Sequence, residues 1–131
     1  DNRLEKSVFL YGSKTDTNYI LSQCDIGVLS SASEGLPLAL IEYGFNALAV
    51  IVTDVGDCNK IVTHNMTGQL IPPSNVKALS EAMLVYIGND TLRKAVANQL
   101  KEYVQLKFSK EANIKMIIKH YKDLSSSDGK I

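Results

Sequence analysis

Residues 25–53 read DIGVLSSASEGLPLALIEYGFNALAVIVT in one-letter code, and this stretch decides the fold class. It begins with the short apolar run Asp25 to Leu29 and ends with a second apolar run, Ala49 to Thr53. Between them, Leu38 to Phe45 follows a proline, a residue that suits the first turn of a helix. Strand, helix and strand in this order make a βαβ crossover the economical interpretation.

Two further apolar runs extend this unit. We expect strands at Val8 to Tyr11 and at Gln69 to Ile71 as well. All these runs are apolar throughout rather than alternating, which is typical of parallel strands covered on both faces. The sequence therefore predicts an α/β fold, with a Rossmann-like, doubly wound parallel sheet of about four strands followed by C-terminal helices.

The pattern changes to helices after Pro72 and Pro73. Ser74 or Asn75 can cap the first of them, and Ser109 can cap the last. We place these helices at Val76 to Ile87, at about Thr91 to Lys107, and from Ser109 to about Leu124.

The last helix carries one apolar stripe. Its members recur at the spacing of a single helix face and are Ile114, Ile117, Ile118 and Tyr121. We expect the stripe to dock onto the domain, and a basic amphipathic helix that lies on a membrane is the alternative. The polar tail from Ser125 to Ile131 is expected to be disordered, so the domain is predicted to cover residues 1–124.

Composition narrows the class of protein. The chain has 131 residues, of which 45% are hydrophobic, and 14 acidic residues balance 14 basic ones. Its lysines are concentrated in the C-terminal third among glutamates, so no basic stripe for nucleic acid is indicated. Cys24 and Cys58 are isolated, which suggests neither a disulfide framework nor a zinc site. The chain begins with Asp1 rather than Met, and we therefore expect it to be a piece of a longer protein.

Ligands of open parallel sheets bind beyond the carboxyl ends of the strands. Three loops fall there, at Gly12 to Lys14, Ser30 to Pro37, and Asp54 to Lys60. The second loop is the informative one because it leads directly into an apolar helix. The backbone N–H groups at that helix start, from Gly35, Leu36 and Leu38, carry partial positive charge and can hold a phosphate.

Two glutamates mark the same segment. Glu42 lies among apolar residues one turn into the helix, where it can accept hydrogen bonds from a ligand such as a ribose. Pairing with a lysine, or an exposed edge, is the plainer interpretation of Glu42 alone. Glu34 alone is also ambiguous, because acidic residues favour helix starts for reasons of the helix dipole. Together, at this spacing, the two residues indicate a binding site.

The segment Glu34 to Glu42, with Gly35 and Pro37 after the first glutamate, resembles the signature of the retaining GT-B glycosyltransferases of family 4. The likeness covers roughly residues 8 to 122 and continues in several blocks in the right order. They are Val8 to Gly12, Cys24 to Ser31, Val50 to Gly56, and Asn65 to Pro73.

The resemblance implies an activity and a role for each site residue. Such enzymes transfer a sugar from a nucleoside diphosphate to an acceptor hydroxyl with retention of configuration, without an obligatory metal or other cofactor. Glu42 would hold the ribose hydroxyls of the donor, and Glu34 would face the transferred sugar. The amides of Gly35, Leu36 and Leu38 would hold diphosphate and sugar oxygens, and Gly12 and Ser13 would border the base pocket. Whether Glu34 is a nucleophile or stabilises an oxocarbenium-like transition state is left open, and we favour stabilisation.

The sequence departs from the family pattern at three places. Where the family has Gly-x-Pro after the signature helix, this chain has Ala47 to Ala49. Asp57 stands in place of a second glycine, and Lys60 in place of an acid. These departures concern the helix turn and the rim of the pocket.

The resemblance also implies partners that lie outside these residues. The family's basic pair for the donor phosphates and its N-terminal acceptor domain are not among them, so we expect this chain alone to be inactive. The partners expected are a nucleotide-sugar donor and the missing acceptor domain, and no nucleic acid. We expect a hexosyltransferase of polysaccharide or glycolipid synthesis, located in the cytoplasm, with peripheral association at the inner face of the membrane as the alternative.

Two other classes compete with this interpretation. One is a noncatalytic α/β binding module of the same fold, which the presence of both glutamates disfavours. The other is a phospho-receiver domain, which needs paired acidic residues where this chain has Gly12 to Lys14, and a phosphoacceptor Asp where it has Ser30 and Ser31.

Overall fold

The computed structural model describes residues 4–127, apart from the side chains of residues 120, 121 and 123–127. Its centre is a parallel three-stranded sheet in the order β1-β2-β3. The strands are β1 (Ile26–Leu29), β2 (Ala49–Thr53) and β3 (Gln69–Ile71). Ile26 pairs with Ala49, and Ile51 pairs with Gln69. The predicted α/β class with a parallel sheet is confirmed.

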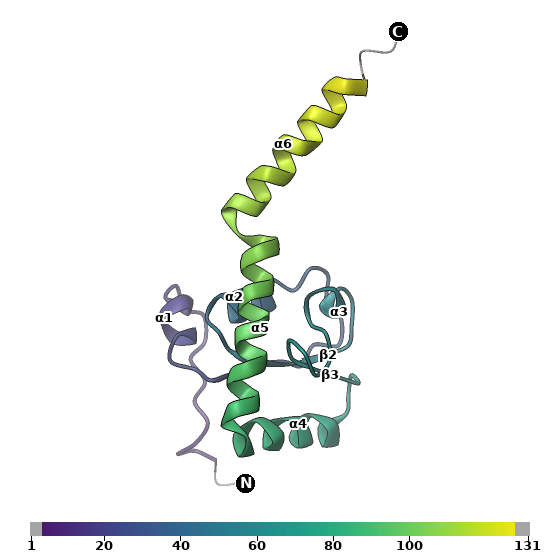
Figure 1. Cartoon of the computed structure of the whole chain (residues 1–131). Helices are drawn as coiled ribbons and strands as arrows, with labels where there is room; N and C mark the ends of the chain where they lie inside the picture. The colour runs from purple at the N-terminus through teal and green to yellow at the C-terminus, as the bar shows by residue number, and fades with distance from the viewer. Residues whose placement is uncertain (1–3, 128–131) are drawn as a thin grey trace.

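Helices precede, connect and follow the strands. The short helix α1 (Thr17–Leu21) precedes β1, α2 (Leu38–Phe45) connects β1 to β2, and α3 (Cys58–Ile61) connects β2 to β3. After β3 come α4 (Val76–Gly88), α5 (Asp90–Phe108) and α6 (Lys110–Ser127). The helices α2 and α3 lie on one side of the sheet, α4 lies on the other, and α5 runs from the α4 side to the α2 side (Figure 1).

The core has two halves because β2 is buried on both faces. Val50 and Val52 pack with Leu40 of α2 and Leu100 of α5 in one half. The other half contains Ala49, Ile51, Ile71, Ala82, Tyr86, Val96 and Ala97. Each fully buried valine, leucine or isoleucine side chain of this core contributes about 1.5–3 kcal/mol. Burial also raises the pKa of Tyr86, whose side chain is inaccessible, to about 12.

Two glycines let α2 pack closely on its neighbours. A Cβ atom added at Gly27 of β1 would lie 2.6 Å from the ring of Tyr43 in α2. A Cβ atom added at Gly44 of α2 would lie 2.8 Å from the Val104 side chain of α5. Both distances are too short for a real side chain, so α2 is clamped between the sheet and α5.

The predicted helix caps are present. Asn75, rather than Ser74, caps α4 by accepting a hydrogen bond from the N–H of Ala78 at 2.9 Å. Ser109 accepts a bond from the N–H of Ala112 at the start of α6, and Asn89, which was not predicted as a cap, caps α5 in the same way. Local sequence signals therefore placed these helix starts correctly.

The strand predicted at Val8 to Tyr11 is not formed. The segment is irregular, and its four side chains are between 54% and 97% exposed. A strand exists only through hydrogen bonds to a neighbouring strand, and the ladders of the described sheet join β1, β2 and β3 alone. The apolar run therefore has strand composition without a partner.

The predicted docking of the last helix is also wrong. Ile114, Ile117 and Ile118 are 46%, 53% and 48% exposed, and α6 projects away from the sheet (Figure 1). At Ser109 the backbone is extended, with φ −64° and ψ 159°, so the chain changes direction after α5. The side chain of Tyr121 lies outside the described residues.

The last helix ends later than the predicted Leu124. The helix α6 continues to Ser127, so residues 125–127 are helical rather than disordered. The rest of the predicted tail, residues 128–131, lies outside the described residues.

Candidate functional site

Two loops meet beyond the carboxyl ends of β1 and β2. Gly56, in the loop after β2, has φ +53°, and a Cβ atom there would lie 1.8 Å from the carbonyl oxygen of Glu34. The N–H of Asp57 donates a hydrogen bond to the carbonyl of Gly35 at 3.4 Å. Only glycine permits this approach, so Gly56 fixes where the backbone of Glu34 lies.

The carboxylate of Glu34 is held from its own loop. The hydroxyl of Ser31 donates a hydrogen bond of 2.5 Å to Glu34 Oε1, and both residues are half-buried. Thr53, at the end of β2, is 3% exposed and donates from its hydroxyl to the carbonyl of Ser31 at 2.6 Å. The sheet is thereby connected to the carboxylate through two hydrogen bonds.

Beneath this loop lies a buried thiol, that of Cys58 at the start of α3. Burial, and then the nearby carboxylates of Glu34, Asp54 and Asp57, raise its pKa. The thiol therefore stays protonated and unreactive at neutral pH.

The start of α2 leaves its backbone donors available. The helix begins at Leu38, and Pro37 precedes it without a side-chain cap. Within the described part of the chain, the N–H groups of Gly35, Leu36 and Leu38 donate to no acceptor. Such unpaired donors at a helix start suit an anionic group.

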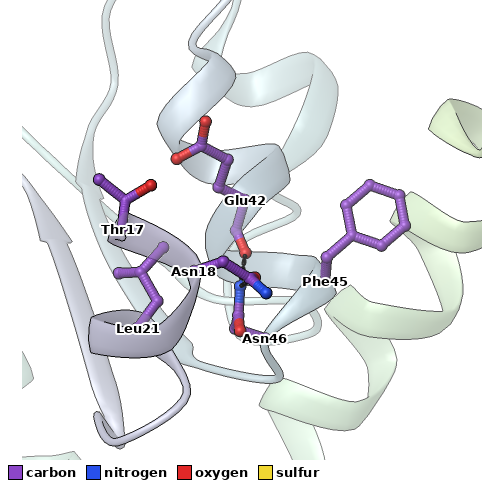
Figure 2. A pocket seen from close by; sticks show the side chains of 6 residues that line it. All are labelled: Thr17, Asn18, Leu21, Glu42, Phe45 and Asn46. Atoms are coloured by element: carbon purple, nitrogen blue, oxygen red, sulfur yellow. Dashed lines mark hydrogen bonds between the residues drawn. The ribbon is translucent and has the colours of Figure 1, made fainter. Parts of the chain in front are cut away.

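Glu42 projects from α2 into open space rather than into the core. It is exposed, which agrees with the exposed edge given as a plainer interpretation of Glu42, and among the described residues it forms no ion pair. Figure 2 shows its side chain beside Thr17 of α1, in a cavity of about 290 Å³ that both residues line. Asn46 Nδ2 donates to Asn18 Oδ1 at 2.9 Å and ties α1 to α2.

Glu42 also lines an adjoining cavity, of about 280 Å³, together with Gly12. Gly12 has φ +64°, the left-handed conformation that favours glycine. The remaining lining comes from the first loop, α1 and α2, namely Tyr11, Lys14, Thr17, Ile20, Leu21, Ala39 and Tyr43. Burial, and then the carboxylate of Glu42, raise the pKa of the Tyr43 hydroxyl, so that Tyr43 stays neutral.

The predicted site residues thus fall into two neighbouring groups. Gly12 and Glu42 share a cavity, whereas Glu34 and Gly35 lie at the loop junction just before α2, and the lining of that cavity includes neither. Ser13 follows Gly12 in the chain but does not line the cavity either, and Leu36 and Leu38 are 54% and 63% exposed.

Several contributing residues were missed from the sequence. Ser31, Thr53 and Gly56 support Glu34, and Lys14 and Thr17 line the cavities around Glu42. The spacing Ser-x-x-Glu at 31–34 was a usable signal, because a hydroxyl three residues before a glutamate often bonds locally. The role of Thr53 had no local signal, since its partner is 22 residues away.

The departures from the family pattern have local consequences. Ala47 takes φ +56°, so the turn after α2 has the left-handed conformation that favours glycine although the residue is an alanine. Lys60 pairs with Asp57 across 2.9 Å, and both side chains are well exposed. The rim of the site therefore carries a local ion pair.

The described residues offer neither a metal cluster nor a bilayer-spanning helix. No group of three or more His, Cys, Asp or Glu side chains among them could hold a metal ion. None of the helices in residues 4–127 combines the length and apolar character needed to cross a bilayer.

Comparison with known proteins gives consistent matches. Residues 2–103 match the sequence model of the family described as glycosyl transferases group 1. An uncharacterised glycosyltransferase of Methanocaldococcus jannaschii is 33% identical over 105 residues, which are 80% of this chain and 30% of that protein. An N,N'-diacetylbacillosaminyl-diphospho-undecaprenol α-1,3-N-acetylgalactosaminyltransferase of Campylobacter jejuni is 30% identical over 91 residues, 70% of this chain and 24% of that protein.

A solved structure is similar over most of the chain. A point mutant of S. aureus TarM, in complex with fondaparinux, α-GlcNAc-glycerol and UDP, superposes with a TM-score of 0.79 at 26% identity. The match covers 88% of this chain and 24% of that one. The chain thus spans about a third or less of the length of these proteins.

Proposed function

Because the chain belongs to the group 1 glycosyl transferases, we propose that it is the donor-binding half of a retaining enzyme of the family 4 type. The enzyme would move a sugar from a nucleoside diphosphate to an acceptor hydroxyl. The observation that carries the proposal is the exposed, unpaired carboxylate of Glu42, which lines a cavity with Gly12 one turn after a helix start with free N–H groups.

The three parts of a donor correspond to three chemical features. Two ribose hydroxyls can both donate to the carboxylate of Glu42, which accepts hydrogen bonds only. The diphosphate is matched by the N–H groups of Gly35, Leu36 and Leu38, aided by the positive end of the α2 dipole. The base is matched by the cavity that Gly12 lines, and Ser13 is the next residue in the chain.

Glu34 is proposed to act on the transferred sugar. Its carboxylate lies at the loop that precedes the phosphate-binding N–H groups, as expected for a group next to the sugar. Positive charge develops on the sugar ring in an oxocarbenium-like transition state, and a fixed carboxylate stabilises it. We favour this role over attack as a nucleophile.

The wider setting is also proposed. We infer that the acceptor is bound by a domain corresponding to the larger part of the relatives that this chain does not span. The name of the C. jejuni relative describes transfer of a sugar to a saccharide linked to undecaprenol diphosphate. This supports a hexosyltransferase of glycolipid or polysaccharide synthesis. With such a substrate, we propose that the full-length enzyme is cytoplasmic and associates peripherally with the inner face of the membrane.

The test measures donor binding. Isotope-labelled chain is titrated with UDP and GDP, and amide chemical shifts are followed, since this method detects millimolar affinity. We expect one nucleotide to perturb residues 12–17 and 35–42. Glu42→Ala should weaken its binding at least about tenfold, because hydrogen bonds to a charged group contribute about 1.5–3 kcal/mol. Glu102→Ala, at an exposed glutamate of α5, is the matched control and should bind as the wild type does.

Two outcomes would count against the proposal. If Glu42→Ala binds the nucleotide as tightly as Glu102→Ala does, the ribose role of Glu42 is wrong. If neither nucleotide binds, even to a protein extended to the length of the relatives, the chain is a noncatalytic module of the same fold. Sugar transfer by the 131-residue chain alone would contradict the proposed division between donor and acceptor halves.

A further inference from the structure

The Glu34 carboxylate has one hydrogen-bond donor among the described residues, the hydroxyl of Ser31. The distance of 2.5 Å is at the short end of the range for a hydroxyl and a carboxylate, where hydrogen bonds are strong. The bond engages Oε1, so that oxygen cannot turn freely. The second carboxylate oxygen, Oε2, is left to accept from a ligand.

Ser31 is itself held in place by the sheet. The buried hydroxyl of Thr53 donates to the carbonyl of Ser31 at 2.6 Å and reaches the carbonyl of Leu29 at 3.4 Å. Thr53 is the last residue of β2, the strand buried on both faces. The backbone of Ser31 is therefore held by the strand that is buried on both faces.

The backbone of Glu34 is fixed separately by Gly56, which packs against its carbonyl oxygen. The backbone contact sets where the residue lies but leaves the side-chain torsions free. A glutamate side chain loses about 1.5–2 kcal/mol of rotamer entropy when it is held in one conformation. A side-chain partner that acts before the ligand arrives removes part of this cost from binding.

From these contacts we propose that Ser31 is a positioning residue, which orients the Glu34 carboxylate toward the sugar of the bound donor. This inference rests on the proposed function, because it assigns Glu34 to the sugar and Glu42 to the ribose. A positioning role for Ser31 predicts different effects on sugar binding and on nucleotide binding, whereas a purely structural role predicts the same effect on both. Loss of the Ser31 hydroxyl should weaken recognition of the sugar and leave recognition of the nucleotide unchanged.

The experiment compares a nucleotide with its sugar conjugate. The chain is titrated by NMR with UDP against UDP-glucose and UDP-N-acetylglucosamine, and with GDP against GDP-mannose. The dissociation constant of the nucleotide divided by that of its sugar conjugate measures how much the sugar contributes to binding. For the best donor, Ser31→Ala should reduce this ratio by about tenfold, the size expected for coupled groups in one hydrogen-bond network, while the nucleotide alone binds as before.

Three further variants separate positioning from folding. Ser31→Thr retains a hydroxyl and should restore most of the sugar's share. Ser33→Ala removes an exposed serine of the same loop, for which the described residues show no hydrogen-bond partner, and should match the wild type. In a Glu34→Ala background, Ser31→Ala should have no additional effect, because the group that it positions is absent.

The outcomes distinguish the two proposals. A Ser31→Ala chain with the wild-type ratio, or with an equal loss for nucleotide and conjugate, overturns the positioning role and leaves the proposed function intact. An additional loss in the Glu34→Ala background also overturns it, since Ser31 would then act without Glu34. If neither the wild-type chain nor a protein extended to the length of the relatives binds a nucleotide or a conjugate, the proposed function fails and this inference fails with it.

Discussion

Ala47 stands where the turn after α2 requires a left-handed backbone. The N–H of Leu48 donates to the carbonyl of Tyr43, and the N–H of Ala47 donates to that of Gly44, a pair of bonds typical of a helix end with glycine at this position. At φ +56° the Cβ atom of Ala47 is strained. We predict that Ala47→Gly raises the free energy of unfolding by about 0.5–1 kcal/mol, net of the greater freedom of glycine in the unfolded chain.

Urea denaturation checks the sign of this effect. The matched control is Ala95→Gly, at an exposed alanine inside α5 with ordinary helical geometry, which should lower the free energy of unfolding by about 1 kcal/mol. If both substitutions destabilise the chain equally, Ala47 is not strained.

At the scale of single residues, the sequence indicated which residues belong together in a site better than it indicated their burial or their hydrogen-bond partners. Glu42 and Gly12 were predicted to share a site, and they line one cavity. Glu42 is exposed, as in the plainer interpretation of this residue, and its apolar neighbours in the sequence did not reveal on which side of α2 the carboxylate lies. The bond from Thr53 to Ser31 joins residues far apart in the chain and follows only from the folded sheet.

The start of α5 depends on one side chain. Asn89 Oδ1 accepts from the N–H of Leu92 at 2.9 Å and satisfies a donor that the helix leaves unpaired. We predict that Asn89→Ala lowers the free energy of unfolding by about 1 kcal/mol. Thermal or urea unfolding measures this value. Asn98→Ala, at an exposed asparagine within the same helix, should change stability by only a few tenths of a kcal/mol. A similar loss in both variants would show that capping is not the cause.

Elements with local signals were predicted well. The three observed strands coincide with apolar runs, α4 begins after the expected cap Asn75, and α5 begins at Asp90, close to the expected Thr91. Val8 to Tyr11 has an equally apolar composition but no ladder. Composition reports the burial that a strand needs, whereas pairing depends on which other strand is adjacent, and that information is not local.

At the scale of the whole molecule, α5 belongs to the core and α6 does not. Leu100 of α5 is fully buried, whereas Ile117 of α6 is 53% exposed. We predict that Leu100→Ala lowers the free energy of unfolding by about 2–5 kcal/mol, and Ile117→Ala by less than about 0.5 kcal/mol. Denaturation of the two variants side by side tests this contrast. A loss of several kcal/mol in Ile117→Ala would mean that α6 folds back onto the domain.

The orientation of α6 marks the limit of periodicity as a predictor. The spacing of Ile114, Ile117 and Ile118 correctly predicted one apolar face on one helix. It could not identify what that face contacts, because the direction of α6 is set by the extended backbone at a single residue, Ser109. A helix and its apolar stripe depend on the residues of one segment, whereas the docking of that stripe depends on how the rest of the chain is folded.

The close packing at two glycines connects the helix that carries Glu42 to the interior of the fold. Gly27 and Gly44 do not line the two cavities around Glu42, yet a methyl group on either would push against the helix that carries Glu42. A helix moves nearly as a rigid body, so a shift of α2 by a few tenths of an ångström moves the Glu42 carboxylate by a comparable amount. This is roughly the 0.5 Å tolerance of a precise site. The absence of a side chain at these two positions thus sets how closely α2 packs, and with it the position of the Glu42 carboxylate.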